Sequence, residues 1–212
     1  MAIVWPCSLS VEEYVAAGRD LAVPRPDCPT CWAPMGFWSG YWRSIWEAGE
    51  DLKMFVRRAR CGFCQATHAL LPAFCLTNRL HSAEVIGEAI ETVALSPSGV
   101  RPVAAHLDVP YTTARGWVRR FSARAKELAS AFAGLAAELG GQIVRPAHDL
   151  LAWAARAILA AFDAAHARPG WAAITAWRFV STVTGGRAIA TNRNSPYLVV
   201  GRRYFMAPVP ST

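Results

Sequence analysis

The chain has 212 residues, a formal net charge of +7 and a sequence pI near 9.4. Its 20 arginines against 2 lysines favour a nucleic-acid partner, because arginine is a planar, bidentate donor that suits phosphates and guanine edges. A GC-rich bacterial genome is the alternative source of this arginine preference. No secretory signal and no apolar run long enough to span a bilayer are visible, so we expect a cytoplasmic, nucleoid-associated protein whose six cysteines are thiols or metal ligands.

A helical leader is predicted over residues 1–27. Its pattern "SVEEYVAAGRDLA" begins at Ser10, the expected N-cap, and has Glu13 at the capping-box position. The pattern ends at "VPRP", just before the first of four regularly spaced cysteines.

These four cysteines have the spacing C-x2-C-x29-C-x2-C, which indicates a metal site. Between the two pairs, "GFWSGYWRSIW" and "LKMFVRRARC" read as strands joined around "EAGED", and this hairpin would bring the pairs together. Tetrahedral zinc takes four thiolates, and such a closed shell leaves no position for water or substrate. We therefore predict a zinc ribbon over residues 28–80 that holds one structural zinc ion. The predicted ligands are Cys28, Cys31, Cys61 and Cys64.

The main alternative for a Cys-x-x-Cys pair is a thioredoxin-like redox motif, but neither pair has the βαβ context that it needs. Cys7 and Cys75 lie outside the spacing and are expected to be buried or free thiols. His68 is expected to be a strand histidine rather than a ligand.

Three arginines precede the second cysteine pair in "RRARC". Strand alternation places Arg58 and Arg60 on one face of the strand and Arg57 on the other. We expect Arg58 and Arg60 to contact phosphate and Arg57 to pack or pair elsewhere.

Residues 81–121 have the pattern of a helix-turn-helix domain, within "GVRPVAAHLDVPYTTARGWVRRF". The turn "LDVP" separates a short helix from a second helix that begins at Tyr111, and such a second helix enters the major groove by its N-terminal residues. We expect Arg115 and Arg119 to reach base edges or phosphates, and other polar residues to position the DNA backbone. The predicted contacts are Tyr111, Thr112, Thr113, Arg115, Arg119 and Arg120. The inward residues are Ala114, Trp117, Val118 and Phe121, with His106 in the core. An ordinary helical hairpin with a solvated basic face is the alternative.

The order of these parts resembles the N-terminal targeting region of bacterial insertion-sequence transposases and of related short standalone proteins of mobile elements. The resemblance covers about residues 28–125 and rests on the "CPTC" knuckle, the second knuckle followed by "THALLP", and "TTARGWVRRF". It implies that the four cysteines form zinc knuckles and that Thr113 and residues 115–120 belong to the recognition helix. Those transposases continue into a DDE catalytic domain, and this chain does not, so the resemblance implies DNA recognition rather than strand transfer.

We expect no enzymatic activity. A DDE site needs three carboxylates in a sheet-based core. After residue 121 only four carboxylates remain, all in predicted helices, and no phosphate-binding, hydrolase or zinc-protease motif is present.

Residues 122–184 are predicted to form a helical association domain, followed by an extended tail over residues 185–212. Between residues 114 and 139 apolar residues recur with coiled-coil spacing, in a seam that continues the recognition helix. This seam, or the apolar C-terminal helices, could join two chains in a homodimer, and an intramolecular bundle is the alternative.

The expected fold is mainly α with a small β zinc ribbon, and the 39 alanines favour it because alanine loses no side-chain entropy in a helix. The first functional hypothesis is sequence-specific binding of double-stranded DNA by a mobile-element protein. It would act as a targeting factor or repressor in transposition, recombination or transcription regulation, with a transposase or recombinase as a further partner. The second hypothesis is an adaptor that docks a recombinase, transposase or polymerase with little DNA contact. Only the first predicts a steep loss of DNA binding as salt rises.

Overall fold

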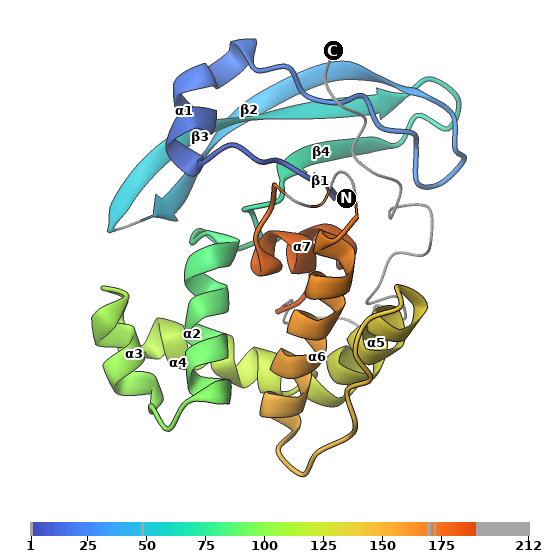
Figure 1. Cartoon of the computed structure of the whole chain (residues 1–212). Helices are drawn as coiled ribbons and strands as arrows, with labels where there is room; N and C mark the ends of the chain where they lie inside the picture. The colour runs from blue at the N-terminus through green and yellow to red at the C-terminus, as the bar shows by residue number, and fades with distance from the viewer. Residues whose placement is uncertain (1, 48, 169–170, 172, 190–212) are drawn as a thin grey trace.

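The computed structural model describes residues 2–47, 49–168, 171 and 173–189. A sheet with α1 beside it forms one layer, and the remaining helices form a second layer below it (Figure 1). The predicted tail therefore lies mostly outside the described residues. In chain order the elements are β1 (Ala2–Trp5), α1 (Val11–Ala17), a 3-10 turn (Gly18–Asp20), β2 (Met35–Glu47), β3 (Glu50–Cys61), β4 (Thr67–Pro72), α2 (Ala83–Leu95), α3 (Val100–His106), α4 (Tyr111–Ser122), α5 (Ala125–Glu138), α6 (Leu150–His166) and α7 (Ala176–Val183).

The expected mainly α fold is wrong. Of the described residues 44% are helical and 22% lie in strands, and that share of strand belongs to a mixed α and β fold. The strands form one four-stranded sheet in the order β1-β4-β3-β2. The β part is therefore larger than a ribbon, because it recruits β1 from the predicted leader and β4 from beyond the second cysteine pair.

The sheet is built around the long β2–β3 hairpin that the sequence predicts. β2 and β3 pair antiparallel from Met35 with Cys61 to Glu47 with Glu50, and β4 continues antiparallel along residues 58–60 of β3. β1 pairs in parallel with β4, in the register Ala2 with Ala69. The β1 strand was not expected, since four apolar residues at a chain end carry little periodicity.

Helix α1 begins as the sequence predicts. The side chain of Ser10 accepts from the backbone N–H of Glu13 at 3.1 Å, and the Glu13 carboxylate accepts from the N–H of Ser10 at 2.7 Å. One turn later the Tyr14 hydroxyl donates to the carbonyl of Phe55, at 3.1 Å, on the part of β3 that β4 does not pair. The leader thus covers an otherwise open strand edge.

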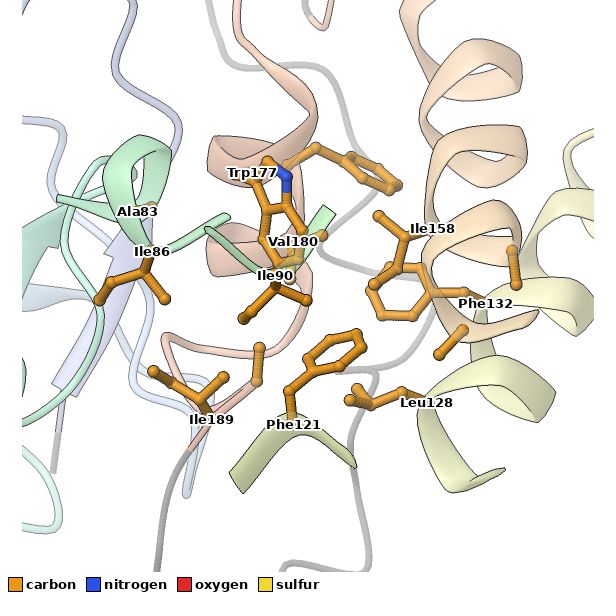
Figure 2. Packing of buried hydrophobic residues seen from close by; sticks show 14 of the residues in the cluster. Ala83, Ile86, Ile90, Phe121, Leu128, Phe132, Ile158, Trp177, Val180 and Ile189 are labelled. Atoms are coloured by element: carbon orange, nitrogen blue, oxygen red, sulfur yellow. The ribbon is translucent and has the colours of Figure 1, made fainter. Parts of the chain in front are cut away.

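The helical layer encloses one continuous apolar core, to which α2, α4, α5, α6 and α7 all contribute (Figure 2). The expected continuous helix along the seam is wrong, because α4 ends at Ser122 and α5 begins at Ala125. Phe121, Leu128 and Phe132 of the seam are buried in this core, so the seam forms an intramolecular bundle. A homodimer stays a prediction. In the described part of the chain no helix is long and apolar enough to cross a membrane.

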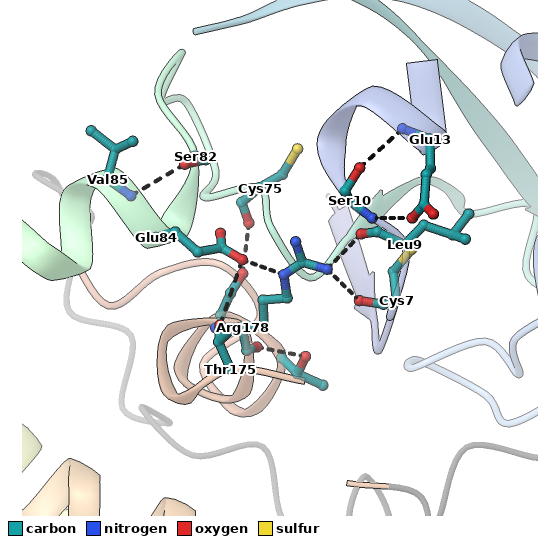
Figure 3. Close-up of polar contacts among 12 residues, drawn as sticks. Cys7, Leu9, Ser10, Glu13, Cys75, Ser82, Glu84, Val85, Thr175 and Arg178 are labelled. Carbon is teal, nitrogen blue, oxygen red and sulfur yellow. Dashed lines mark hydrogen bonds and ion pairs between the residues drawn. The ribbon is translucent and has the colours of Figure 1, made fainter. Parts of the chain in front are cut away.

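Arg178 of α7 joins the two layers (Figure 3). Its guanidinium pairs with Glu84 of α2 and donates to the carbonyls of Cys7 and Leu9, at 3.0 and 2.6 Å, in the segment between β1 and α1. The side chain of Ser181 also donates to the carbonyl of Cys75, at 2.6 Å. One buried cation therefore ties α2, α7 and the N-terminal segment together.

The packing of α2 against α7 predicts that Gly87→Ala destabilises the protein, although replacing glycine with alanine inside a helix normally stabilises it. A Cβ at Gly87 would lie 2.0 to 2.3 Å from atoms of the Trp177 ring, which is held by a 3.0 Å hydrogen bond from its Nε1 to Glu91. Alanine normally stabilises a helix interior by about 1 kcal/mol relative to glycine, but overpacking costs about 1–3 kcal/mol. We expect urea denaturation to show that Gly87→Ala lowers the free energy of unfolding.

Gly134→Ala on α5 is the matched control, since nothing lies within 4 Å of its added Cβ. It should raise the free energy of unfolding by up to about 1 kcal/mol. Equal effects of the two substitutions would contradict the packing of Trp177 on α2.

Candidate metal centre and nucleic-acid interface

Two knuckles of the same local geometry lie at the open end of the β2–β3 hairpin. In the first, the N–H of Trp32 donates to the carbonyl of Cys28 at 2.8 Å; in the second, the N–H of Gln65 donates to the carbonyl of Cys61 at 3.1 Å. Trp32 and Gln65 both have left-handed backbones, with φ of 63° and 62°. The Cys-x-x-Cys spacing therefore folds twice into the same tight turn, and the antiparallel pairing of β2 with β3 brings the two turns together.

The four predicted ligands converge. The Sγ atoms of Cys28, Cys31, Cys61 and Cys64 all lie within 4.8 Å of one another. Across the two knuckles, Cys28 Sγ lies 3.5 Å from Cys64 Sγ, and Cys31 Sγ lies 3.4 Å from Cys61 Sγ. Each knuckle thus supplies two sulfur atoms to one small cluster, and this cluster could hold a metal ion.

In each knuckle, hydrogen bonds from backbone N–H groups lower the pKa of the first cysteine. The N–H of Cys64 donates to Cys61 Sγ at 3.4 Å, and this is the main cause of a lowered pKa for the Cys61 thiol. At Cys28 burial raises the pKa, but hydrogen bonds from the backbone of Thr30 and Cys31 outweigh it and lower the pKa to about 6. Deprotonated sulfur is the form that binds metal.

The other thiols and the strand histidine lie where the sequence predicts. Cys7 and Cys75 are buried outside the cluster, and burial raises the pKa of Cys75 to about 12. His68 lies buried in β4, and burial lowers its pKa, which favours the neutral form of this strand histidine. None of the three belongs to the four-sulfur cluster.

The two helices of the predicted helix-turn-helix are present as α3 and α4. The second helix turns its four expected inward residues into the core, since Ala114, Trp117, Val118 and Phe121 are buried. His106 is an exception to the prediction: it is exposed at the end of α3 and lies 3.6 Å from Glu88. The buried face of α4 is thus the one that the amphipathic spacing of the sequence predicts.

The outer face of α4 carries the predicted DNA contacts with unequal exposure. Tyr111, Thr112, Arg115 and Arg119 are exposed, whereas Thr113 and Arg120 are half-buried. Arg120 folds back along its own helix, where a Cβ on Gly116 would approach its Nη1 to 2.7 Å. The exposed four form the accessible part of the face.

Arg101 is a further basic residue at this face that the sequence reasoning missed. Its guanidinium carbon lies 5.4 Å from the centre of the Tyr111 ring, so α3 delivers a cation to the N-terminal end of α4. The signal was available, because the first helix of a helix-turn-helix crosses the DNA backbone and a basic residue at its start would meet phosphate.

Arg58 and Arg60 lie away from α4, since β3 ends on the opposite side of the molecule from the α3–α4 pair (Figure 1). Arg58 donates to the Thr67 hydroxyl at 3.1 Å, and Arg60 lies over the Trp38 ring at 4.6 Å. Arg57 packs on Phe37 at 5.1 Å. The structure therefore does not bring the strand arginines together with α4, and their contact with phosphate stays a prediction.

Residues 28–105 match a protein-family model described as a domain of unknown function (DUF6431). No curated protein and no solved structure gives a significant match. The matched range begins at the first cysteine and ends within α3, so it spans both knuckles, the hairpin and α2 but not α4. It assigns no activity, and the resemblance to transposase targeting regions stays a prediction.

Proposed function

We propose that this chain is a sequence-specific DNA-binding protein of a bacterial mobile element, acting as a targeting factor or repressor. In this proposal α4 reads duplex DNA and the four-cysteine cluster holds one structural zinc ion. The observation that carries it is the division of α4: a buried apolar face fixes the helix, while Tyr111, Thr112, Arg115 and Arg119 are exposed on the other side.

Zinc is the metal that best fits four converging thiolates. Zinc–sulfur bonds of about 2.3 Å in a tetrahedron place the sulfur atoms about 3.8 Å apart. Cys31 Sγ and Cys61 Sγ lie 3.4 Å apart and all four sulfur atoms lie within 4.8 Å of one another, a range that includes this value. Four protein ligands leave no open position, so the ion would stabilise the knuckles and take no part in chemistry.

The N-terminal end of α4 is suited to phosphate as well as to base edges. No side chain caps this helix, and Pro110 precedes its first turn, so backbone N–H groups there are available to an anion. Arg101 adds a cation beside Tyr111, and Arg115 follows one turn later. We assign Arg101 to the DNA backbone and Arg115 to base edges.

A pair of substitutions tests this assignment. Arg115→Ala should cost about 1–3 kcal/mol on the preferred duplex and relax its base preference, whereas Arg101→Ala should weaken binding to all duplexes about equally and reduce the salt slope by about 1. Fluorescence anisotropy with preferred and scrambled duplexes, over a range of salt, measures both. Identical profiles for the two variants, or no loss in either, would argue against reading by α4.

A further inference from the structure

A row of alternating arginines and aromatic rings lies on the β2–β3 hairpin, apart from α4. We name it the hairpin stripe, and define it as Arg19, Arg25, Phe37, Trp42, Phe55 and Arg57. Arg19 lies in the 3-10 turn, Arg25 in the segment before the first knuckle, and the other four on β2 and β3. Three parts of the chain that are separate in sequence therefore build one surface.

The contacts along the stripe are regular. At one end Arg25 and Arg57 lie over Phe37, with guanidinium carbons 5.3 and 5.1 Å from the ring centre. At the other end Arg19 lies 5.7 Å from the Trp42 ring and 5.1 Å from the Phe55 ring. Arg57 also donates to the carbonyl of Arg19 and so links the two ends. These cation–π contacts hold the guanidinium planes beside the rings.

The middle of the stripe depends on a glycine. Gly40 pairs with Arg57 across the hairpin, and a Cβ at Gly40 would lie 2.2 Å from the Phe55 ring. The ring therefore lies directly over the β2 backbone, where only glycine leaves room for it. The result is a continuous surface of flat groups from Phe37 to Trp42.

The stripe faces away from the helical layer. Arg43, the neighbour of Trp42 on β2, points to the other face of the sheet, because its guanidinium donates to the carbonyl of Arg79 just before α2. Trp42 is 50% exposed and Phe37 is 39% exposed. Large aromatic side chains exposed in a row on a sheet are a sign of a binding surface.

The positive charge of the stripe indicates which kind of partner it would bind. Three arginines lie along it, and within the described residues none of the ion pairs involves them. Arginines that alternate with flat rings suit a single nucleic-acid strand, because its phosphates can pair with the cations and its unpaired bases can stack on the rings. A duplex hides its base faces, so it could use the arginines but not the rings.

We propose that the hairpin stripe binds a single strand of DNA. Bases stack on Trp42 and on the guanidinium planes, while the phosphates pair with Arg19, Arg25 and Arg57. The choice of DNA over RNA rests on the proposed function, but the surface itself does not use α4. The chain would thus hold duplex and unpaired DNA at two separate sites.

The test uses the full-length, metal-loaded protein and a fluorescein-labelled 15-nucleotide strand of mixed sequence, with anisotropy as the readout. Wild type should bind the strand, Trp42→Ala should weaken binding about tenfold or more, and Trp42→Phe should restore most of it. Arg25→Ala, at an exposed position outside the strands, should lower the salt slope by about 0.7, which corresponds to one phosphate on a single strand. If Trp42→Ala does not fold, the salt slope of Arg25→Ala decides the test.

Tyr41→Ala is the matched control, because Tyr41 immediately precedes Trp42 on β2, is 40% exposed and points to the opposite face. It should leave strand binding unchanged. Absence of strand binding, equal losses for Trp42→Ala and Tyr41→Ala, or tighter binding to the same sequence as RNA would overturn the proposal. Binding of duplex DNA separates the two claims: Arg115→Ala should impair it while Trp42→Ala does not.

Discussion

Cys61→Ser is expected to abolish metal binding and to unfold both knuckles together with the open end of the β2–β3 hairpin. Cys61 is fully buried, its Sγ lies 3.4 Å from Cys31 Sγ, and its backbone is the last paired position of β3. Structural zinc contributes about 10–16 kcal/mol in zinc-finger peptides, which is comparable to the whole stability of an ordinary domain, about 5–15 kcal/mol. Metal content of the purified protein and near-ultraviolet circular dichroism measure the two effects.

Cys75→Ala provides the control for a buried thiol that is not a ligand. Cys75 is 1% exposed and its sulfur lies 3.7 Å from the Met54 sulfur, outside the four-cysteine cluster. The variant should keep one bound metal ion per chain, with a modest loss of stability from the small cavity. A Cys61→Ser protein that keeps its metal and its fold would refute the site.

Arg178→Ala is expected to lower the free energy of unfolding by about 3–5 kcal/mol, the usual cost of removing one partner of a buried ion pair. The carboxylate of Glu84, which is 26% exposed in the wild-type structure, would lose its cation, and the carbonyls of Cys7 and Leu9 would lose their donor. Because Arg178 links α2 and α7 to the N-terminal segment, the backbone amides of β1 should also lose protection from hydrogen exchange. Urea denaturation and amide hydrogen exchange measure these effects.

Arg156→Ala on α6 is the comparison, since Arg156 is an exposed arginine on a neighbouring helix. Substitutions at such surface positions usually change stability by no more than about 0.5 kcal/mol. Equal stability of the Arg178 and Arg156 variants would show that the link between the layers contributes nothing.

Local patterns in this sequence predicted local structure well. The spacing of the four cysteines located the sulfur cluster, the alternation on either side of "EAGED" located β2 and β3, and the Ser10–Glu13 pair located the start of α1. The 3.6-residue period also identified the buried face of α4. In each case the information lies within a few residues, or in a spacing that one metal ion would enforce.

Long-range pairing explains what the sequence did not reveal. β1 and β4 pair in parallel, residues 2–5 with residues 69–72, and the sequence "AIVW" does not indicate which strand it pairs with. The seam predicted one helix, but the chain turns between Ser122 and Ala125 so that α5 packs on α6 inside the same core. The spacing of apolar residues indicates which face of a helix is buried, but it does not indicate whether the same chain or a second chain covers that face.

The hairpin stripe was missed for a similar reason. Strand alternation correctly separated Arg57 from Arg58 and Arg60, but it could not show that Arg19 and Arg25 fold back over the rings of β2 and β3. What looks like a run of three arginines before Cys61 is divided between an aromatic surface on one face and a hydrogen bond to Thr67 on the other.

Selection of bound sequences from random duplex DNA, with the metal-loaded full-length protein at several salt concentrations, tests the central claim most directly. We expect an enriched motif, recovery that falls steeply as salt rises, and loss of the motif in Arg115→Ala. Recovery of unenriched sequences with little dependence on salt would contradict duplex reading by α4 and would favour an adaptor that binds protein instead.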